Sequence, residues 1–298
     1  MSVDPSQPSF IRGDKAAFTV RGDYLFGAPM SGGKVRYTVT RSQTSFAPPK
    51  TDGFVVDDSA YRWALADWSA RGGKLQGGDG ALSEKGTFEA AVGLTLPKQE
   101  APENVSFEAE IEDLSRQTIA SQATTLVHPA EFYVALQQPK EMFVAANAPI
   151  RATVAAVEPS GARRVGVSVS VDLLARTWAT ATEATGEDGL HYESRAIDKV
   201  VATCEAKTTA DVAGCDLRPT EAGFYIVRAR AADKRGNPVA SSYGVYVSGD
   251  SARVAWPVYD GPRLELVTDK ESYEVGDVAK VLVKSPFKEA EALVTVER

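Results

Sequence analysis

The two cysteines are the residues whose type and spacing most readily suggest covalent chemistry. Cys204 and Cys215 lie eleven positions apart, with turn-forming residues at 211–214 between them. Neighbouring strands or the base of a loop would bring them together, so both a disulfide and two buried free thiols fit, and we favour the disulfide. It would stabilise the fold by at most about 3 kcal/mol, and it would place the protein outside the reducing cytosol.

The chain has two histidines, His128 and His191, and these are the candidate bases for nucleophilic catalysis. His128 precedes a proline, and His191 lies in a loop-like stretch. The sequence contains no Gly-x-Ser-x-Gly motif, the sharp turn that exposes a serine nucleophile in many hydrolases. Neither histidine stands at ligand spacing from the cysteines, which argues against a metal site. We therefore expect no catalytic, cofactor-binding or metal-ligating residues, and no enzyme activity.

Several groups of carboxylates could in principle serve a glycosidase or a calcium ion. Asp57 and Asp58 are adjacent, but they lack the alternating oxygen ligands around a glycine that a calcium loop needs. Glu108, Glu110 and Glu112 alternate with apolar residues, so we expect them to mark the solvent face of one strand. No spacing in the sequence indicates two carboxylates that converge across a cleft.

Three tryptophans, Trp63, Trp68 and Trp256, could form a stacking platform for carbohydrate. Aromatic residues more often pack in a core or at an edge, and we favour that interpretation here. Two Arg-Gly-Asp tripeptides, at 12–14 and 21–23, spell an integrin-recognition motif. Their Gly-Asp pairs are already explained by turns, so we do not expect integrin binding.

The composition limits the kinds of partner. The 298 residues carry a formal net charge of −7, and the acidic excess is spread along the chain. A nucleic-acid surface needs clustered Lys and Arg, which are absent, so we expect no nucleic-acid partner. No apolar run approaches the roughly 18 residues of a membrane span, and residues 1–8 do not resemble a signal peptide. We expect no membrane insertion in this segment.

The elements that must position these residues are strands. Runs such as 105–113 and 165–174 alternate apolar and polar residues, and no stretch sustains a helical period. Turn residues separate the runs so that roughly 120 residues hold six to eight short strands, which is the pattern of a β-sandwich. The predicted class is all-β.

The same pattern of residues starts three times, at Phe10, Phe143 and Tyr273. Each copy has an aromatic residue, a turn and an alternating apolar run. The starts lie 133 and 130 residues apart, a spacing that corresponds to whole domains. A second repeat closes each copy, because Asp113 and Asp233 each precede an Ala-Ser pair at the same offset.

These repeats predict consecutive domains of one type. We expect a disordered tail at 1–8, β-sandwiches at 9–129 and 130–250, and at 251–298 a joint followed by the first strands of a truncated third sandwich. The third copy is too short to bury a core of its own. The chain is therefore expected to be a piece of a longer protein.

The motifs resemble those of the macroglobulin-like domains of bacterial alpha-2-macroglobulins. The resemblance rests on the stretches 22–29, 220–225, 233–241 and, most clearly, 273–298. It covers nearly the whole chain. It implies tandem antiparallel β-sandwiches, related to immunoglobulin and fibronectin type III folds, of which two are complete and one is truncated.

What the resemblance implies about function is a protease trap. In such proteins a string of sandwiches forms a frame, proteases cut a bait segment, and the molecule closes around them. Many members carry a Cys-x-x-Gln thioester. Cys204 is followed by Glu-Ala-Lys and Cys215 by Asp-Leu-Arg, so neither fits that motif. The segment is thus expected to be scaffold for a broad-spectrum endopeptidase inhibitor.

The resemblance further implies partners and a location. The partners would be proteases, met through the full-length protein, and other macroglobulin-like domains of the same chain. The location would be periplasmic or extracellular, with a membrane anchor in an N-terminal segment that this sequence lacks. The alternative is a cell-surface adhesin or carbohydrate-binding module built from tandem sandwiches.

Overall fold

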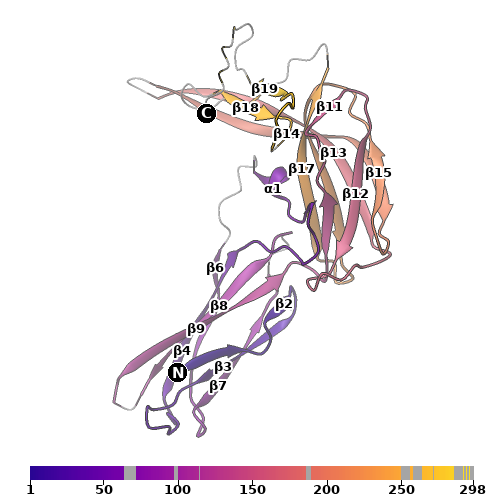
Figure 1. Ribbon diagram of the computed structural model, residues 1–298. Helices are drawn as coiled ribbons and strands as arrows, with labels where there is room; N and C mark the ends of the chain where they lie inside the picture. The colour runs from indigo at the N-terminus through magenta and orange to yellow at the C-terminus, as the bar shows by residue number, and fades with distance from the viewer. Residues whose placement is uncertain are drawn as a thin grey trace.

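The computed structural model describes residues 1–63, 72–96, 100–113, 115–185, 189–249, 256–257, 264–270, 272–284, 291, 293 and 295. Two β-sandwiches follow each other end to end and meet at a bend (Figure 1). A short hairpin lies beyond the second sandwich. No helix among these residues is long and apolar enough to cross a membrane.

The first sandwich packs a three-stranded sheet on a five-stranded sheet. The order of the smaller sheet is β1 (Ser2–Pro5), β3 (Lys15–Arg21), β7 (Thr87–Gly93). The order of the larger sheet is β2 (Ser9–Ile11), β9 (Thr118–His128), β8 (Glu103–Glu112), β4 (Lys34–Gln43), β6 (Gly73–Ala81).

The second sandwich repeats this arrangement and adds one strand. The smaller sheet runs β15 (Ala213–Leu217), β12 (Ile150–Val157), β10 (Tyr133–Gln137), β5 (Phe54–Val55). The larger sheet runs β11 (Phe143–Ala145), β17 (Pro238–Ser248), β16 (Gly223–Ala232), β13 (Ser168–Thr185), β14 (Gly189–Lys207). Outside both lie the one-turn helix α1 (Ser59–Arg62) and the hairpin of β18 (Glu265–Thr268) and β19 (Val281–Lys284).

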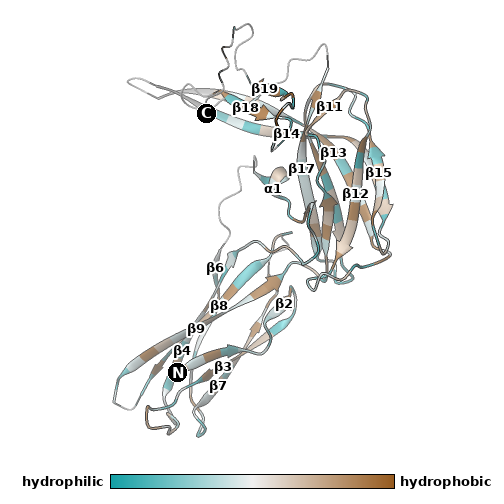
Figure 2. Cartoon of the chain, in the orientation of Figure 1, coloured by the Kyte–Doolittle hydropathy of each residue, from teal (hydrophilic) through white to brown (hydrophobic). Residues whose placement is uncertain are grey.

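Alternation along the strands builds both cores, as β8 shows. Val105, Phe107 and Ile111 are fully buried, while Glu108 and Glu110 between them are exposed. The same two-residue alternation appears as neighbouring brown and teal segments along the strands of Figure 2. The prediction of an all-β fold is therefore confirmed, because each strand buries one face between two sheets.

The sequence repeat that opens each copy corresponds to the same strand in each sandwich. Phe10 lies in β2, which pairs in parallel with β9, and Phe143 lies in β11, which pairs in parallel with β17. These edge pairs depart from the purely antiparallel sheets that we expected. The chain crosses from one sheet to the other just before β2 and β11, and it then runs in the same direction as the last strand.

The prediction of a disordered tail at residues 1–8 is wrong. β1 pairs antiparallel with β3, from Ser2 opposite Arg21 to Pro5 opposite Phe18. Val3 contributes to the core at 7 % exposure. Pro5 is tolerated because β1 is an edge strand, where a missing N–H leaves no internal ladder bond unmade, and Pro8 lies outside the strand.

Candidate functional site

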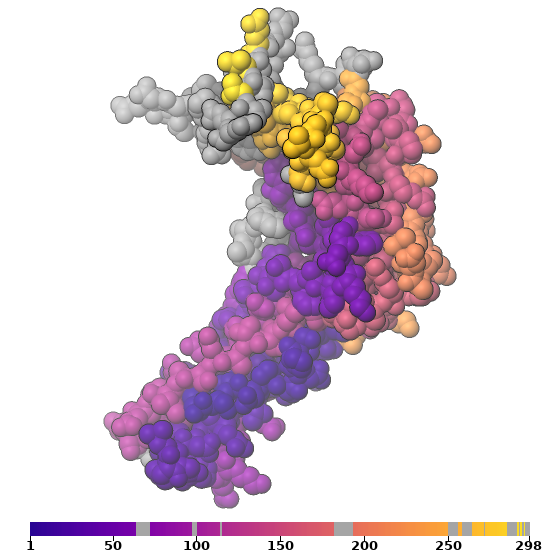
Figure 3. Space-filling model, viewed as in Figure 1, coloured from indigo at the N-terminus to yellow at the C-terminus, as the bar shows by residue number. Residues whose placement is uncertain are grey.

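The feature that sets this chain apart from two separate sandwiches is a segment that crosses from the first to the second. We call residues 46–63 the strap. It follows β4 of the first sandwich, and its strand β5 extends the smaller sheet of the second by pairing with β10. Gln138 N–H donates to the Gly53 carbonyl at 3.0 Å and prolongs that pairing. In Figure 3 the strap, in purple, lies against the pink second sandwich.

The helix of the strap is held on the larger sheet by backbone and hydroxyl groups. α1 contacts β17 and β16. Ser242 on β17 donates its N–H to the Asp57 carbonyl at 3.0 Å, and its hydroxyl oxygen accepts from Tyr61 N–H at 2.9 Å. One serine thus pairs with the carbonyl of Asp57, just before α1, and with an N–H inside α1 that a one-turn helix cannot satisfy itself.

A buried ion pair fixes the start of α1. Arg228 on β16 donates to both carboxylate oxygens of Asp58, with the shortest contact 2.7 Å from Nη2 to Oδ2. The Asp58 side chain is fully buried and that of Arg228 is 14 % exposed. Burial raises the pKa of Asp58, and the charge and hydrogen bonds of Arg228 oppose that rise. The guanidinium also lies 3.8 Å from the centre of the Tyr61 ring.

A second buried arginine fixes the end of α1. Arg176 on β13 is 1 % exposed, and its guanidinium is bidentate to Asp198 at 2.7 and 2.8 Å. The same group donates to the Tyr61 carbonyl at 2.7 Å and to the Ala60 carbonyl at 3.4 Å. A cation at the carbonyl end of a helical turn is favourable both as a hydrogen-bond donor and as a charge.

On the opposite side of the joint a turn of the second sandwich meets the first. Asp233 Oδ1 accepts from the N–H groups of Arg235 and Asn237, and Oδ2 accepts from Glu131 N–H. Burial by itself would raise the pKa of Asp233, but these hydrogen bonds outweigh it and lower the pKa. The side chain stays ionised and holds the turn in shape.

That turn places Arg235 across the boundary. Its Nη1 lies 2.6 Å from Asp14 Oδ1 of the first sandwich, and Asn237 Nδ2 donates to the Arg12 carbonyl at 3.3 Å. Asp14 also accepts from Ile11 N–H at 2.9 Å. Residues 12–14, the first Arg-Gly-Asp tripeptide, therefore form part of the joint.

His128 and Tyr133 stand at the point where one sandwich passes into the next. The two side chains share a hydrogen bond of 2.8 Å between His128 Nδ1 and Tyr133 Oη, and Phe46 of the strap packs edge-on against the imidazole at 4.7 Å. Burial lowers the pKa of His128 to about 4 and raises that of Tyr133. The predicted candidate base is thus a neutral residue of the joint, bonded to a phenol.

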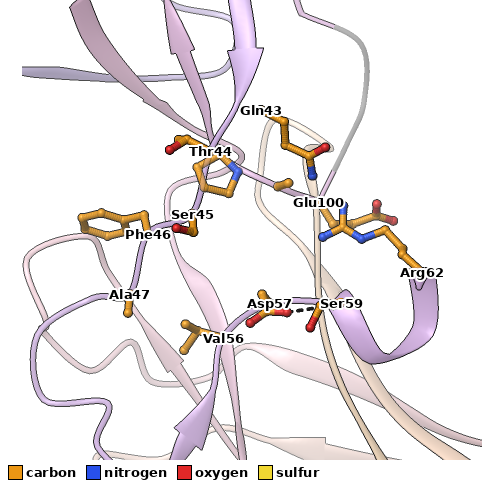
Figure 4. A pocket seen from close by; sticks show the side chains of 12 residues that line it. Gln43, Thr44, Ser45, Phe46, Ala47, Val56, Asp57, Ser59, Arg62 and Glu100 are labelled. Carbon is orange, nitrogen blue, oxygen red and sulfur yellow. Dashed lines mark hydrogen bonds between the residues drawn. The ribbon is translucent and has the colours of Figure 1, made fainter. Parts of the chain in front are cut away.

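Beneath the strap lies an open cleft of about 880 Å³. Figure 4 shows Phe46 and Val56 on its apolar side and Asp57, Arg62 and Glu100 on its polar side. The start of the strap, at Phe46 and Ala47, and its end, from Val56 to Arg62, both line this cleft.

The two cysteines are joined by a disulfide in the structure. Cys204 lies on β14 at the edge of the larger sheet, and Cys215 lies on β15 at the edge of the smaller one. The bond therefore links the two sheets of the second sandwich across its open side. With both sulfurs in the disulfide, neither is a thiol available for a thioester.

The tryptophans that the structure describes do not form the flat platform that carbohydrate stacking requires. The ring of Trp178, only 9 % exposed, lies between Trp63 and Trp256 and is tilted by 44° and 38° against them. Trp256 packs further against Tyr246, so these rings belong to a packed cluster. Trp68 lies outside the described residues.

The other predicted sites are not brought together into a reactive centre by what the structure describes. The side chain of His191 lies outside the described part of the chain. Within that part no group of three or more His, Cys, Asp or Glu residues is arranged to hold a metal ion. Asp57 and Asp58, which the sequence identified only as a pair of adjacent acids, belong to the strap that contacts the second sandwich.

No family model matches this sequence. A curated relative, the alpha-2-macroglobulin homolog of the cyanobacterium Nostoc sp., is 26 % identical over 286 residues, which cover 94 % of this chain and 14 % of the relative. This chain thus spans about one seventh of the length of that protein.

Solved structures show the same likeness at the level of the fold. The native conformation of E. coli alpha-2-macroglobulin aligns with 95 % of this chain and 18 % of its own at a TM-score of 0.56 and 18 % identity. Salmonella alpha-2-macroglobulin reacted with methylamine gives 0.55, 18 % identity and the same coverage of both chains. Both comparisons bear out the resemblance to bacterial alpha-2-macroglobulins, and consecutive macroglobulin-like sandwiches account for it.

Proposed function

We propose that this chain is a framework segment of an alpha-2-macroglobulin-like protease trap. The observation that carries the proposal is the match of nearly the whole chain to one stretch of an alpha-2-macroglobulin homolog. The segment would hold neighbouring parts of the trap at fixed angles, and the bait and any thioester would lie elsewhere in a longer polypeptide. Proteases would then be partners of the whole protein rather than of this segment.

The joint supports the framework role. A pair of sandwiches linked only by residues 129–132 could change their angle freely. The strap adds to that link a strand, a helical turn, the buried Arg228–Asp58 ion pair and the hydrogen bonds from Arg176 to two carbonyls of α1. Contacts of this kind have one favourable arrangement, because a small displacement leaves buried charges unpaired. A frame built this way can carry a rearrangement from one end to the other instead of absorbing it.

The location that we propose is periplasmic or extracellular, with a membrane anchor outside this segment. The disulfide between Cys204 and Cys215 supports an oxidising compartment. E. coli alpha-2-macroglobulin, which has been solved after activation by porcine elastase, offers a practical choice of protease for a test.

The test compares two substrates of elastase in the presence of the intact polypeptide that contains this segment. A trapped protease keeps its active site but loses access to large substrates, so cleavage of casein should fall while cleavage of a small chromogenic peptide persists. The isolated 298 residues should change neither rate. Undiminished casein cleavage at a molar excess of the intact polypeptide would refute the protease trap.

A second arm tests the framework role. Arg228→Met in the intact polypeptide removes one of the buried charges that fix the strap and should weaken the protection of casein. Arg36→Met is the matched control, because Arg36 also sits on a strand and pairs with an aspartate, but its side chain is 78 % exposed. If both variants protect casein as well as the unmodified protein does, the joint has no role in trapping, although the protease trap itself would stand.

A further inference from the structure

The cleft beneath the strap has the size and the position of a ligand site. Its volume of about 880 Å³ lies within the roughly 300–1,000 Å³ that is typical of binding clefts. Residues 100–102 of the first sandwich line it together with the strap, which contacts the second sandwich. It therefore lies where two domains meet, and binding sites concentrate at such places.

One wall of the cleft is a stretch of backbone with unused hydrogen-bonding groups. The ladder between β4 and β8 ends where Thr44 N–H donates to the Pro102 carbonyl at 3.0 Å. Ser45, Phe46 and Ala47 follow directly and line the cleft, and they make no backbone hydrogen bond within the part of the chain that the structure describes. Their N–H and C=O groups are therefore available to the backbone of an added segment.

The apolar part of the lining is held in place by its own packing. The Phe46 ring packs on His128 at 4.7 Å and on Tyr133 at 5.6 Å, so its position is set by the joint. Val56 packs against the small apolar cluster of the second sandwich, and Ala101 is only 4 % exposed. These groups form a fixed apolar surface against which apolar side chains of a ligand could be buried.

The polar part of the lining carries two carboxylates, and each has one oxygen to spare. Asp57 Oδ1 accepts from Ser59 N–H at 2.7 Å, and Glu100 Oε1 lies 3.4 Å from Arg228 Nη2. The second oxygen of each makes no hydrogen bond with the described residues. Arg62 is the one cation among the lining residues that the structure describes, so two acids outnumber one base and the cleft complements a cation.

We propose that this cleft binds a short, extended segment of a separate polypeptide that carries a lysine or arginine between apolar residues. The backbone of the segment would pair with residues 45–47, its cation would reach Asp57 or Glu100, and its apolar neighbours would lie against Phe46 and Val56 (Figure 4). Main-chain hydrogen bonds would supply affinity, and the side chains would select the sequence. Ser45, Ala47 and Asp57 are exposed, so the segment can enter from outside without opening the joint. The inference does not depend on the protease trap.

The test measures the binding of a fluorescein-labelled peptide, Leu-Val-Lys-Val-Leu-amide, by fluorescence anisotropy. The peptide should bind both the 298 residues and the intact polypeptide that contains them. Replacing its lysine by glutamate should weaken binding at least tenfold, because a carboxylate would meet the carboxylates of the cleft. Methylating the amide nitrogens of its two valines should weaken binding by a similar factor, because it removes two donors from the peptide backbone.

Substitutions in the chain test the charge of the cleft. The double variant Asp57→Asn with Glu100→Gln keeps the oxygens that accept from Ser59 N–H and face Arg228, but it removes both negative charges. It should bind the lysine peptide at least tenfold more weakly. Glu108→Gln with Glu110→Gln is the matched control, because these two exposed carboxylates lie on β8 outside the cleft, and it should bind as the unmodified chain does.

A third variant tests the place of binding. Ser45→Trp should fill the cleft and abolish binding, and it should leave the thermal midpoint unchanged because Ser45 is exposed. The proposal would be overturned if the lysine peptide failed to bind at millimolar concentration, if the lysine and glutamate peptides bound equally, or if Ser45→Trp bound as tightly as the unmodified chain. Binding to the 298 residues but not to the intact polypeptide would assign the cleft to another segment of the same polypeptide and would also overturn it.

Discussion

Replacing Arg228 by methionine should release the strap from the second sandwich. The substitution keeps most of the length of the side chain and removes the cation that lies 2.7 Å from Asp58. Asp58 is fully buried, so its carboxylate would remain inside the protein without its bidentate partner.

The expected cost follows from the burial of the pair. Removing one partner of a buried ion pair destabilises by about 3–5 kcal/mol. We expect the lower end, about 3 kcal/mol, because Arg62 also acts on Asp58 and Met retains packing against Tyr61. Every 1.4 kcal/mol is a factor of ten, so opening of the strap should become roughly a hundredfold more frequent.

The pH dependence of the variant has a definite sign. Burial already raises the pKa of Asp58 against the opposition of Arg228, and removal of Arg228 raises it further. A raised pKa in the folded state means that proton binding favours the folded form. The loss should therefore be largest at neutral pH and should shrink as the pH falls and Asp58 becomes neutral.

Hydrogen exchange over residues 54–63 is the direct assay, because Trp63 N–H is bonded to the Ser59 carbonyl within the strap. Arg228→Met should lower protection there roughly a hundredfold, and Arg36→Met should not. The double variant Arg228→Met with Asp58→Leu should recover most of the protection, since apolar groups in place of both charges are often neutral. Unchanged protection in the single variant would refute the account of the ion pair as a lock.

Three further predictions concern the second sandwich and its junction with the first. Burial lowers the pKa of His128 to about 4, so the unfolding free energy should fall by about 3 kcal/mol as the pH drops from 6.5 to 4. In urea titrations the unfolding free energy of His128→Phe should depend less on pH than that of the unmodified protein, and an equal dependence would contradict this. Replacing Cys204 and Cys215 by alanine should lower the free energy of unfolding by about 3 kcal/mol and abolish the effect of reductant on the melting temperature. If reductant does not change the melting temperature of the unmodified protein, the disulfide does not stabilise the fold as described. Trp178→Ala should cost about 3–5 kcal/mol in urea unfolding and Trp63→Ala, at 45 % exposure, clearly less; comparable losses would show that the rings do not pack as described.

The parts of the fold that were predictable are those set by near neighbours in the chain. Alternation in β8 could be recognised because burial of one face imposes a period of two on any strand. The turns at Asp113 and Asp233 could be matched because a short acidic side chain caps its own turn within four residues. Each of these signals lies within a window of about ten residues.

The strap could not be found in this way. Asp58 and Arg228 are 170 positions apart, and nothing near either residue indicates the other. Asp57 and Asp58 are chemically identical neighbours, yet one caps Ser59 N–H in an exposed position while the other is fully buried. Their difference arises from the surface against which α1 lies, which is a property of the assembled sandwich.

The duplication of the sandwich explains where such long-range features arise. Asp113 and Asp233 hold the same turn, but the residue two positions on is Ser115 in one copy and Arg235 in the other. Only Arg235 reaches a neighbouring sandwich, at Asp14. Local turn chemistry is therefore common to both copies, and the contact between sandwiches depends on a position where they differ. Within a repeated fold, charged residues that appear in one copy only are the places to look for its joints.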